Sequence, residues 1–150
     1  MKETDLNGKI GGVVGFYEKP TISKIKVFSV DDETRYLDHV KSGLEETGEF
    51  EVTTCQSPAV ALIQIQNAPP DFLILDINMP HIDGGDFLCR MQNNPSLRDI
   101  PTLMVSSLIS PSEMSENGVV ENGGQAMMAK PADIEKLKAY IKSQLACCLA

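Results

Sequence analysis

From Ile25 onward, a short apolar segment and a longer helical pattern alternate five times along the chain. Such alternation is typical of successive β–α–β crossovers, which build a parallel sheet with helices on both faces. It therefore predicts an α/β fold: a doubly wound, five-stranded parallel sheet with five helices. The predicted strands are IKVFSV (25–30), EFEVTT (49–54), FLILD (72–76), TLMVS (102–106) and QAMMAK (125–130).

The hydropathy of the strands predicts their order in the sheet. Residues 72–75 are uniformly apolar, as in a strand that is buried on both faces. Residues 49–52 instead alternate between Glu and an apolar residue, which is typical of an edge strand. A central third strand and an edge second strand agree with the strand order 2-1-3-4-5.

Capping side chains predict where three of the helices begin. Ser57–Pro58, Ser110–Pro111 and Asp133 each precede a segment with helical character, and Glu113 completes a capping box with the second of them. We therefore expect one helix to begin near residue 58, one near residue 111 and one near residue 134.

The chain has 150 residues and a net charge of −8, which favours one acidic domain. An acidic chain is a poor candidate for direct binding to nucleic acid or to an anionic membrane. It has no apolar run of membrane-spanning length, and its four cysteines lack the spacing of a zinc site, so we expect a cytoplasmic protein. We expect residues 25–150 to form the domain and residues 1–24 to form a flexible extension.

Polar side chains collect where the predicted strands end. Asp31 and Asp32 follow the first strand, Asp76 ends the third, Ser106 ends the fourth and Lys130 ends the fifth. The carboxyl ends of parallel strands meet at one edge of the sheet, where ligands bind near the switch in strand order. The sequence therefore predicts a single site that contains these side chains.

The predicted charges of this site indicate its chemistry. Three carboxylates and one ammonium give a formal charge of −2, which one divalent cation would neutralise. Oxygen ligands at a hydrated site favour Mg²⁺. Asp76 is then a candidate nucleophile that attacks phosphorus and forms an aspartyl phosphate, with Lys130 and Ser106 in contact with the phosphoryl group.

Four segments together resemble the receiver (CheY-like) domains of two-component response regulators. They are VFSVDDE (27–33), LILDINMPHIDGG (73–85), IPTLMVSS (100–107) and MAKP (128–131). The resemblance implies that Asp76 is the phosphoacceptor. It also implies that Asp76 is one of the residues that bind Mg²⁺. Of the others, Asp32 binds it directly, Asp31 binds it through water, and the backbone carbonyl of Asn78 completes the protein ligands.

The resemblance further assigns Ser106 as the hydroxyl switch residue and Lys130 as the phosphate-binding lysine. The Lys130–Pro131 bond matches a family position that often has a cis peptide. Met127 departs from the pattern, because the family usually has Tyr or Phe there and a thioether cannot perform an aromatic rotamer switch. Leu108 offers no polar group to orient an attacking water, so we expect slow autodephosphorylation.

As a receiver, the chain would take its phosphoryl group from a histidine kinase or a phosphotransfer protein and would signal to a downstream protein target. It would catalyse only its own phosphorylation and dephosphorylation, and it could form a homodimer through the fourth helix, fifth strand and fifth helix. A phosphorylation-independent docking module with the same fold is the alternative, and Met127 favours it. A haloacid-dehalogenase-like phosphatase would need Asp where the chain has Asn78.

Overall fold

A computed structural model of the protein describes residues 23–79 and 82–149. The expected extension over residues 1–24 lies almost entirely outside the described residues, so the prediction about its flexibility is untested. Among the described residues, no helix combines the length and the apolar character needed to cross a membrane.

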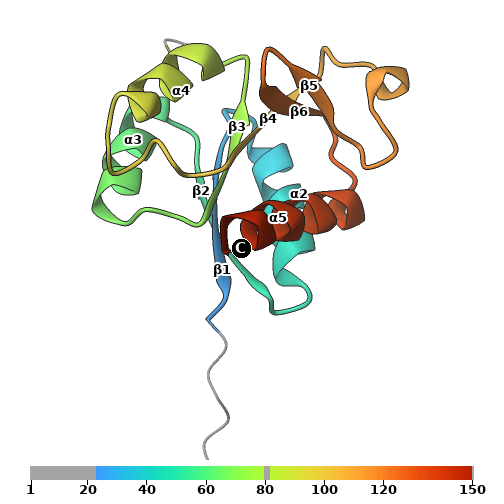
Figure 1. Ribbon diagram of the computed structural model, residues 1–150, viewed down its shortest axis with the longest axis horizontal. Helices are drawn as coiled ribbons and strands as arrows, with labels where there is room; N and C mark the ends of the chain where they lie inside the picture. Colours follow the sequence, from blue (N-terminus) through green and yellow to red (C-terminus); the bar gives the residue numbers. More distant parts are fainter. Residues whose placement is uncertain (1–22, 80–81, 150) are drawn as a thin grey trace, which may run out of the picture.

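The centre of the fold is a twisted sheet in the order β2-β1-β3-β4-β6-β5 (Figure 1). All five predicted strands are present, are parallel and lie in the predicted order, with the edge and central positions confirmed for the second and third. A sixth strand pairs antiparallel with the last of them. The strands are β1 (Ile25–Val30), β2 (Phe50–Cys55), β3 (Phe72–Asp76), β4 (Thr102–Ser106), β5 (Val120–Asn122) and β6 (Gln125–Ala129).

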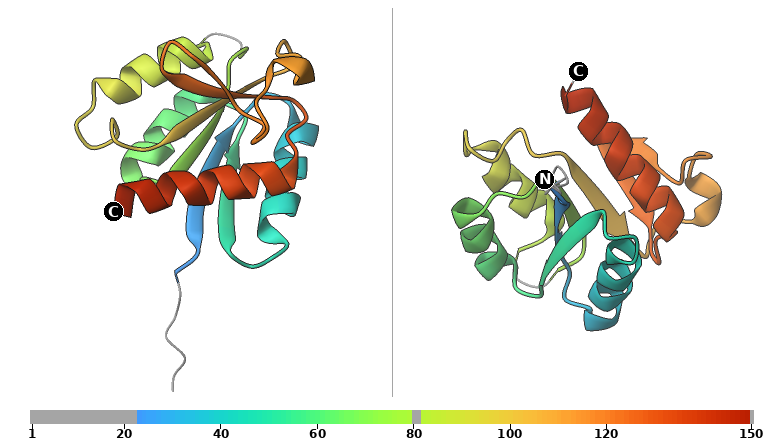
Figure 2. Two further views of the ribbon diagram at one scale, coloured as in Figure 1. Left: turned by 45° about the vertical axis from the view of Figure 1, so that its right-hand side comes forward. Right: turned by 90° about the horizontal axis from the view of Figure 1, so that it is seen from below.

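Four α-helices of the described chain cover the two faces of the sheet (Figures 1 and 2). Helices α3 (Pro58–Asn67) and α4 (Gly84–Gln92) cover one face, and α2 (Thr34–Glu45) and α5 (Ile134–Leu149) cover the other. The predicted cap at Ser57 is confirmed, because its side chain accepts a hydrogen bond from the Val60 amide. Because helices cover both faces of a mainly parallel sheet, the predicted doubly wound α/β fold is confirmed.

One predicted helix is wrong: no α-helix begins after Ser110. The capping box does form, since the Glu113 carboxylate accepts from the Ser110 amide at 2.8 Å. It closes only one 3₁₀ turn, Pro111–Glu113. Gly118 then has a φ of +82°, which ends any helical path, and Gly123 and Gly124 form the turn of the β5–β6 hairpin. The described chain thus has four of the five expected helices.

Apolar side chains fill both sides of the sheet and hold the strands at a fixed register. Alternate residues of β3 face opposite ways, so Phe72 and Ile74 pack toward α2 and α5, while Leu73 and Leu75 pack toward α3 and α4. All four are fully buried. A strand buried on both faces cannot shift without moving apolar groups into water, which fixes the position of Asp76 at its end.

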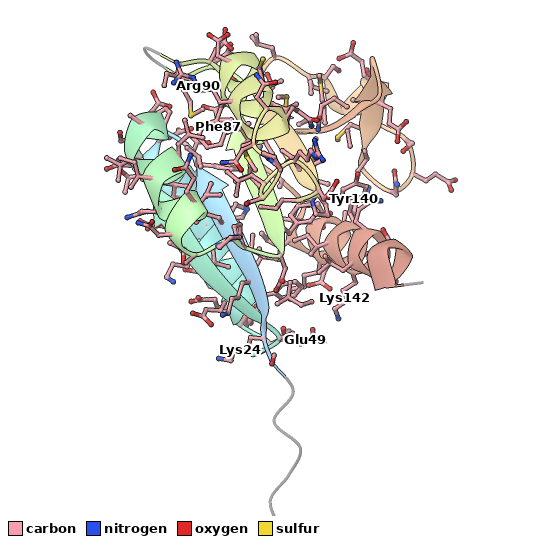
Figure 3. The ribbon with its side chains drawn as sticks, turned by 60° about the vertical axis from the view of Figure 1, so that its left-hand side comes forward. Lys24, Glu49, Phe87, Arg90, Tyr140 and Lys142 are labelled. Atoms are coloured by element: carbon pink, nitrogen blue, oxygen red, sulfur yellow. The ribbon has the colours of Figure 1, made fainter. Side chains whose placement is uncertain are left out.

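Side chains of α2 satisfy the free edge of β2. The Val52 amide donates to the Glu45 carboxylate at 2.9 Å, and the Val52 carbonyl accepts from Lys41 Nζ at 2.7 Å. Lys41 and Glu45 also pair with each other at 3.0 Å. A second ion pair joins Lys142 of α5 to Glu49, just before β2, at 2.8 Å (Figure 3).

Candidate functional site

Three carboxylates converge at the carboxyl edge of the sheet. Asp31 and Asp32 follow β1, and Asp76 is the last residue of the neighbouring strand β3. One oxygen from each carboxylate lies within 4.8 Å of the others. Asp31 and Asp76 are buried, with 0% and 4% of their surfaces exposed, whereas Asp32 is exposed. The sequence-predicted acidic cluster therefore forms, with one member open to solvent.

Lys130 brings a positive charge to this cluster from the end of β6. Its Nζ lies 2.8 Å from Asp31 Oδ2 and 3.6 Å from both Asp76 Oδ2 and Glu33 Oε1. Its amide donates to the Ser106 carbonyl at 3.0 Å, which ties its backbone to the end of β4. The expected cis peptide between Lys130 and Pro131 is present. The ammonium is closest to Asp31, and Asp76 is its more distant partner.

Burial and the neighbouring charges change the proton affinity of these groups. Burial, followed by repulsion from Asp31, raises the pKa of Asp76 to about 6, although Lys130 and the Asn78 amide oppose the rise. Burial alone would lower the pKa of Lys130, but the hydrogen bond and charge of Asp31 outweigh it, so this pKa is raised. Lys130 therefore stays charged. Its single positive charge does not fully compensate the negative charge of the carboxylates around it.

An open cleft of about 430 Å³ leads to the cluster. Its lining includes four residues from the sequence analysis and two that it did not assign. Glu33 is the third acid of the DDE segment, and its charge could have suggested a place in the site. Ser107 carried no separate signal, because it follows another serine. The lining residues are Asp32, Glu33, Asp76, Asn78, Ser107 and Lys130.

The remaining predicted residues lie around the cleft in different environments. Ser106 is 2% exposed, and its hydroxyl oxygen accepts from the Leu108 amide at 3.0 Å. Asn78 is exposed, and its amide donates to Asp76 Oδ1 at 3.3 Å. Met127 is partly buried against the core on the α3 and α4 side of the sheet. Ser106 is thus less accessible than its neighbour Ser107, which lines the cleft.

Tyr36, in the first turn of α2, is a site neighbour that the sequence did not indicate. Its ring centroid lies 4.7 Å from Lys130 Nζ, and only 5% of the residue is exposed. Burial is the main cause that raises the pKa of the Tyr36 phenol, and the negative charges of Asp31 and Asp76 raise it further. The Ala132 amide opposes this rise, but the phenol stays neutral. Within the described residues its buried hydroxyl makes no hydrogen bond of normal geometry.

The donor set of the site suits Mg²⁺ on its own chemistry. The available ligand atoms are carboxylate oxygens, and Asp32 leaves the cluster open to water. Mg²⁺ prefers oxygen ligands and keeps several waters when it binds through a few carboxylates. A divalent cation would also offset the repulsion between Asp31 and Asp76 that Lys130 leaves uncompensated.

Comparison with known proteins places residues 27–142 within the response regulator receiver domain. The sequence is 38% identical over 112 residues to a protein-glutamate methylesterase/protein-glutamine glutaminase of Chromohalobacter salexigens. It is 27% identical over 122 residues to Response regulator Rre1 of Synechocystis. These alignments cover 74% and 81% of the chain but only 31% and 52% of the relatives, so the chain spans about a third to a half of their length.

Solved structures of receiver domains are also similar to this chain. The chemotaxis protein CheY4 of Vibrio cholerae superposes with a TM-score of 0.67 at 28% identity, covering 81% of this chain and 98% of its own. A CheY-like receiver domain protein of Methanospirillum hungatei superposes with a TM-score of 0.67 at 28% identity, covering 83% and 95%. Both likenesses extend over nearly the whole described part of the chain.

Proposed function

The chain belongs to the response regulator receiver family, and from that premise we propose that it accepts a phosphoryl group on Asp76 in a Mg²⁺-dependent reaction. The observation that carries the proposal is the convergence of Asp31, Asp32 and Asp76 within 4.8 Å, with the Lys130 ammonium among them. Carboxylates at this spacing repel one another strongly. The domain keeps them together at the open end of a cleft, which supports a functional use of the cluster.

Asp76 is the best nucleophile of the cluster. It ends the most buried strand of the sheet and lines the cleft. One carboxylate oxygen attacks the phosphorus of the donor, a new P–O bond forms, and the bond between phosphorus and the leaving group breaks with its electron pair remaining on the leaving group. The Asn78 amide, which donates to Asp76 Oδ1, orients the carboxylate for this attack.

Four residues are proposed to hold the metal, Asp76 among them, and Lys130 is proposed to hold the phosphoryl group. Asp32 would bind Mg²⁺ directly, Asp31 through water, and the carbonyl of Asn78 would complete the protein ligands. Bound Mg²⁺ supplies positive charge to the phosphoryl oxygens during transfer. Lys130 lies 3.6 Å from Asp76 and would contact the same oxygens from the β6 side.

A hydroxyl contact to the phosphoryl group has two candidates in the chain. The family resemblance favours Ser106, whose hydroxyl oxygen accepts from the Leu108 amide while its proton stays free to donate. Ser107 already lines the cleft. Either hydroxyl can donate one hydrogen bond to a phosphoryl oxygen. We propose Ser106 for this role because it is the last residue of β4, as Asp76 is the last residue of β3.

Signal output is proposed to differ from that of a receiver with an aromatic switch. Met127 offers no ring to rotate, and a 3₁₀ turn and the short strand β5 stand where a fourth helix was expected. Phosphoryl transfer does not depend on either feature, since neither lines the cleft. We propose that the phosphodonor is a histidine kinase or phosphotransfer protein and that a downstream protein reads the change at the β4 and β6 ends.

Intact mass spectrometry after incubation with acetyl phosphate and Mg²⁺ tests the function. We expect a single phosphoryl adduct that Asp76→Asn and removal of Mg²⁺ with EDTA both abolish. Asp38→Asn is the matched control, because Asp38 is an exposed carboxylate of α2 away from the cleft and should leave the adduct unchanged. Absence of an adduct in a folded, Mg²⁺-binding wild type would favour a phosphorylation-independent docking module.

A further inference from the structure

We propose that Tyr36 is a positioning residue that holds the Lys130 ammonium over the phosphorylation site. This inference rests on the proposed function of Asp76 and adds a residue to it. The Lys130 Nζ lies 4.7 Å from the ring centroid of Tyr36, within the ~6 Å over which a cation and an aromatic face attract each other. The ring is therefore a fourth partner of the ammonium, beside three carboxylates.

The surrounding core fixes the ring. Tyr36 is 5% exposed and belongs to the apolar cluster between the sheet and helices α2 and α5. On the next turn of the helix, His39 lies with its ring centroid 6.2 Å from that of Tyr36, and its Nε2 lies 3.1 Å from the Ala132 carbonyl. These contacts join α2 to the segment that follows Lys130, so the ring and the lysine backbone keep a constant separation.

The carboxylates alone would not hold Lys130 where phosphoryl transfer needs it. Its closest partner is Asp31 at 2.8 Å, whereas Asp76 is 3.6 Å away. When a cation and a phosphoryl group enter the site, the charges that attract the ammonium change. A neutral aromatic face does not change its attraction in this way. Tyr36 can therefore keep the Lys130 ammonium in place while the ammonium exchanges its hydrogen bond with Asp31 for one with the phosphoryl oxygens.

The aromatic face is the part of Tyr36 that this role needs. Its hydroxyl is buried and makes no hydrogen bond of normal geometry among the described residues. Tyr36→Phe keeps the ring and removes only this hydroxyl, while Tyr36→Leu keeps an apolar side chain and removes the ring. The two variants form a matched pair that separates the face from the bulk of the side chain.

The test measures the rate of phosphorylation by subsaturating acetyl phosphate with Mg²⁺. We expect Tyr36→Leu to lower the rate about five- to tenfold, which lies between the values for loss of an exposed and of a fully desolvated cation–π contact. Tyr36→Phe should restore most of the rate. In a Lys130→Met background, Tyr36→Leu should change the rate less than about twofold, because there is no ammonium left for the ring to hold.

The outcomes separate this inference from the proposed function. A wild type that takes up no phosphoryl group overturns the proposed function, and the inference with it. A wild type that is phosphorylated, with Tyr36→Leu reacting at the same rate, overturns the inference alone. A loss that is equally large in the Lys130→Met background would show that Tyr36 acts only by supporting the fold, which also overturns the inference.

Discussion

At the scale of single residues, the proposed phosphoacceptor Asp76 lies where burial and a neighbouring carboxylate disfavour its ionised form. Asp76 ends a strand whose five residues are all buried, beside a second buried carboxylate, Asp31. Its pKa is raised to about 6, so the ionised form present at neutral pH costs the folded state free energy. Function and stability therefore oppose each other at this position.

Asp76→Asn should stabilise the metal-free domain at neutral pH. The folded-state pKa of about 6 lies above the ordinary value of 3.8, so the cost of ionised Asp76 grows as the pH rises from 4 to 6 and is complete above 6. Removing the whole pKa shift would raise the free energy of unfolding by at most about 3 kcal/mol. Solvent screening at the cleft reduces the expected gain to about 1–2 kcal/mol. Urea unfolding in EDTA at pH 7.5 measures the gain.

The pH dependence is the decisive part of this measurement. Below about pH 3 the carboxyl is protonated in both folded and unfolded chains, so the advantage of the variant should vanish. The exposed control Asp38→Asn should show no comparable pH-dependent gain. A gain that stays constant from pH 4 to pH 8 would contradict the electrostatic origin.

Leu108 gives a second prediction at the residue scale. Its side chain is 79% exposed, while its amide is bonded to Ser106 Oγ, so the side chain can be changed without disturbing the backbone. We expect Leu108→Glu to hydrolyse the aspartyl phosphate at least about threefold faster, because a carboxylate can orient the attacking water. Decay of the phosphorylated mass after removal of acetyl phosphate measures this rate. An unchanged half-life would count against a water path beside residue 108.

At the scale of elements, the turn after β3 is built around the start of α4. The Gly84 amide donates to the Ile77 carbonyl at 2.9 Å. A Cβ on Gly84 would lie only 2.9 Å from the Asp76 carbonyl oxygen and from Ile77 Cα, which are both backbone atoms. The helix can approach the end of β3 this closely only because residue 84 has no side chain.

Gly84→Ala should therefore destabilise the domain more than Gly85→Ala. The first forces the backbone of the Asp76 turn to move, and we expect it to lower the free energy of unfolding by about 1–3 kcal/mol. A Cβ on Gly85 would meet only the Asp83 carboxylate at 3.3 Å, so we expect a change within about 1 kcal/mol. Thermal unfolding compares the two, and equal losses would show that the close approach does not matter.

The elements also show how far a sequence of this kind can be interpreted. The five parallel strands could be predicted because each is an apolar segment of strand length between turn signals. The helix after Ser110 could not, because a capping box governs only the first turn. The Asn-Gly and Gly-Gly pairs at residues 117–118 and 123–124 were the signals for turns and a hairpin there.

The candidate site follows the same rule. Asp31, Asp76 and Lys130 could be placed together because the ends of parallel strands meet, whatever the details of packing. Tyr36 could not be connected to Lys130, since 94 residues separate them and an aromatic residue in an amphipathic helix ordinarily packs in the core. Their contact depends on how the first turn of α2 and the residue after β6 meet at the carboxyl edge of the sheet, which no local pattern encodes.

At the scale of the whole molecule, metal binding should be visible as global stability. A ligand that binds only the folded state adds about 2.7 kcal/mol at one hundred times its Kd. For a domain of this size that corresponds to a rise in Tm of about 5–10 °C. We expect Mg²⁺ to produce such a rise in the wild type.

Removing a ligand carboxylate should reduce this rise. Asp32 is the exposed member of the cluster, so Asp32→Asn should weaken the response to Mg²⁺ with little damage to the core. Differential scanning calorimetry across a Mg²⁺ titration measures both proteins. If Asp32→Asn kept the full wild-type response, the proposed ligand set would be wrong.

The bonded edge of β2 has a consequence for how this molecule behaves in a crowded solution. An open sheet edge is a template to which another chain can add a strand, and it is a common start for aggregation. Lys41 and Glu45 already occupy the outward-facing groups of Val52, while the opposite edge is the three-residue β5, which carries Glu121. Both edges of the sheet therefore carry features that oppose the addition of a strand from another chain.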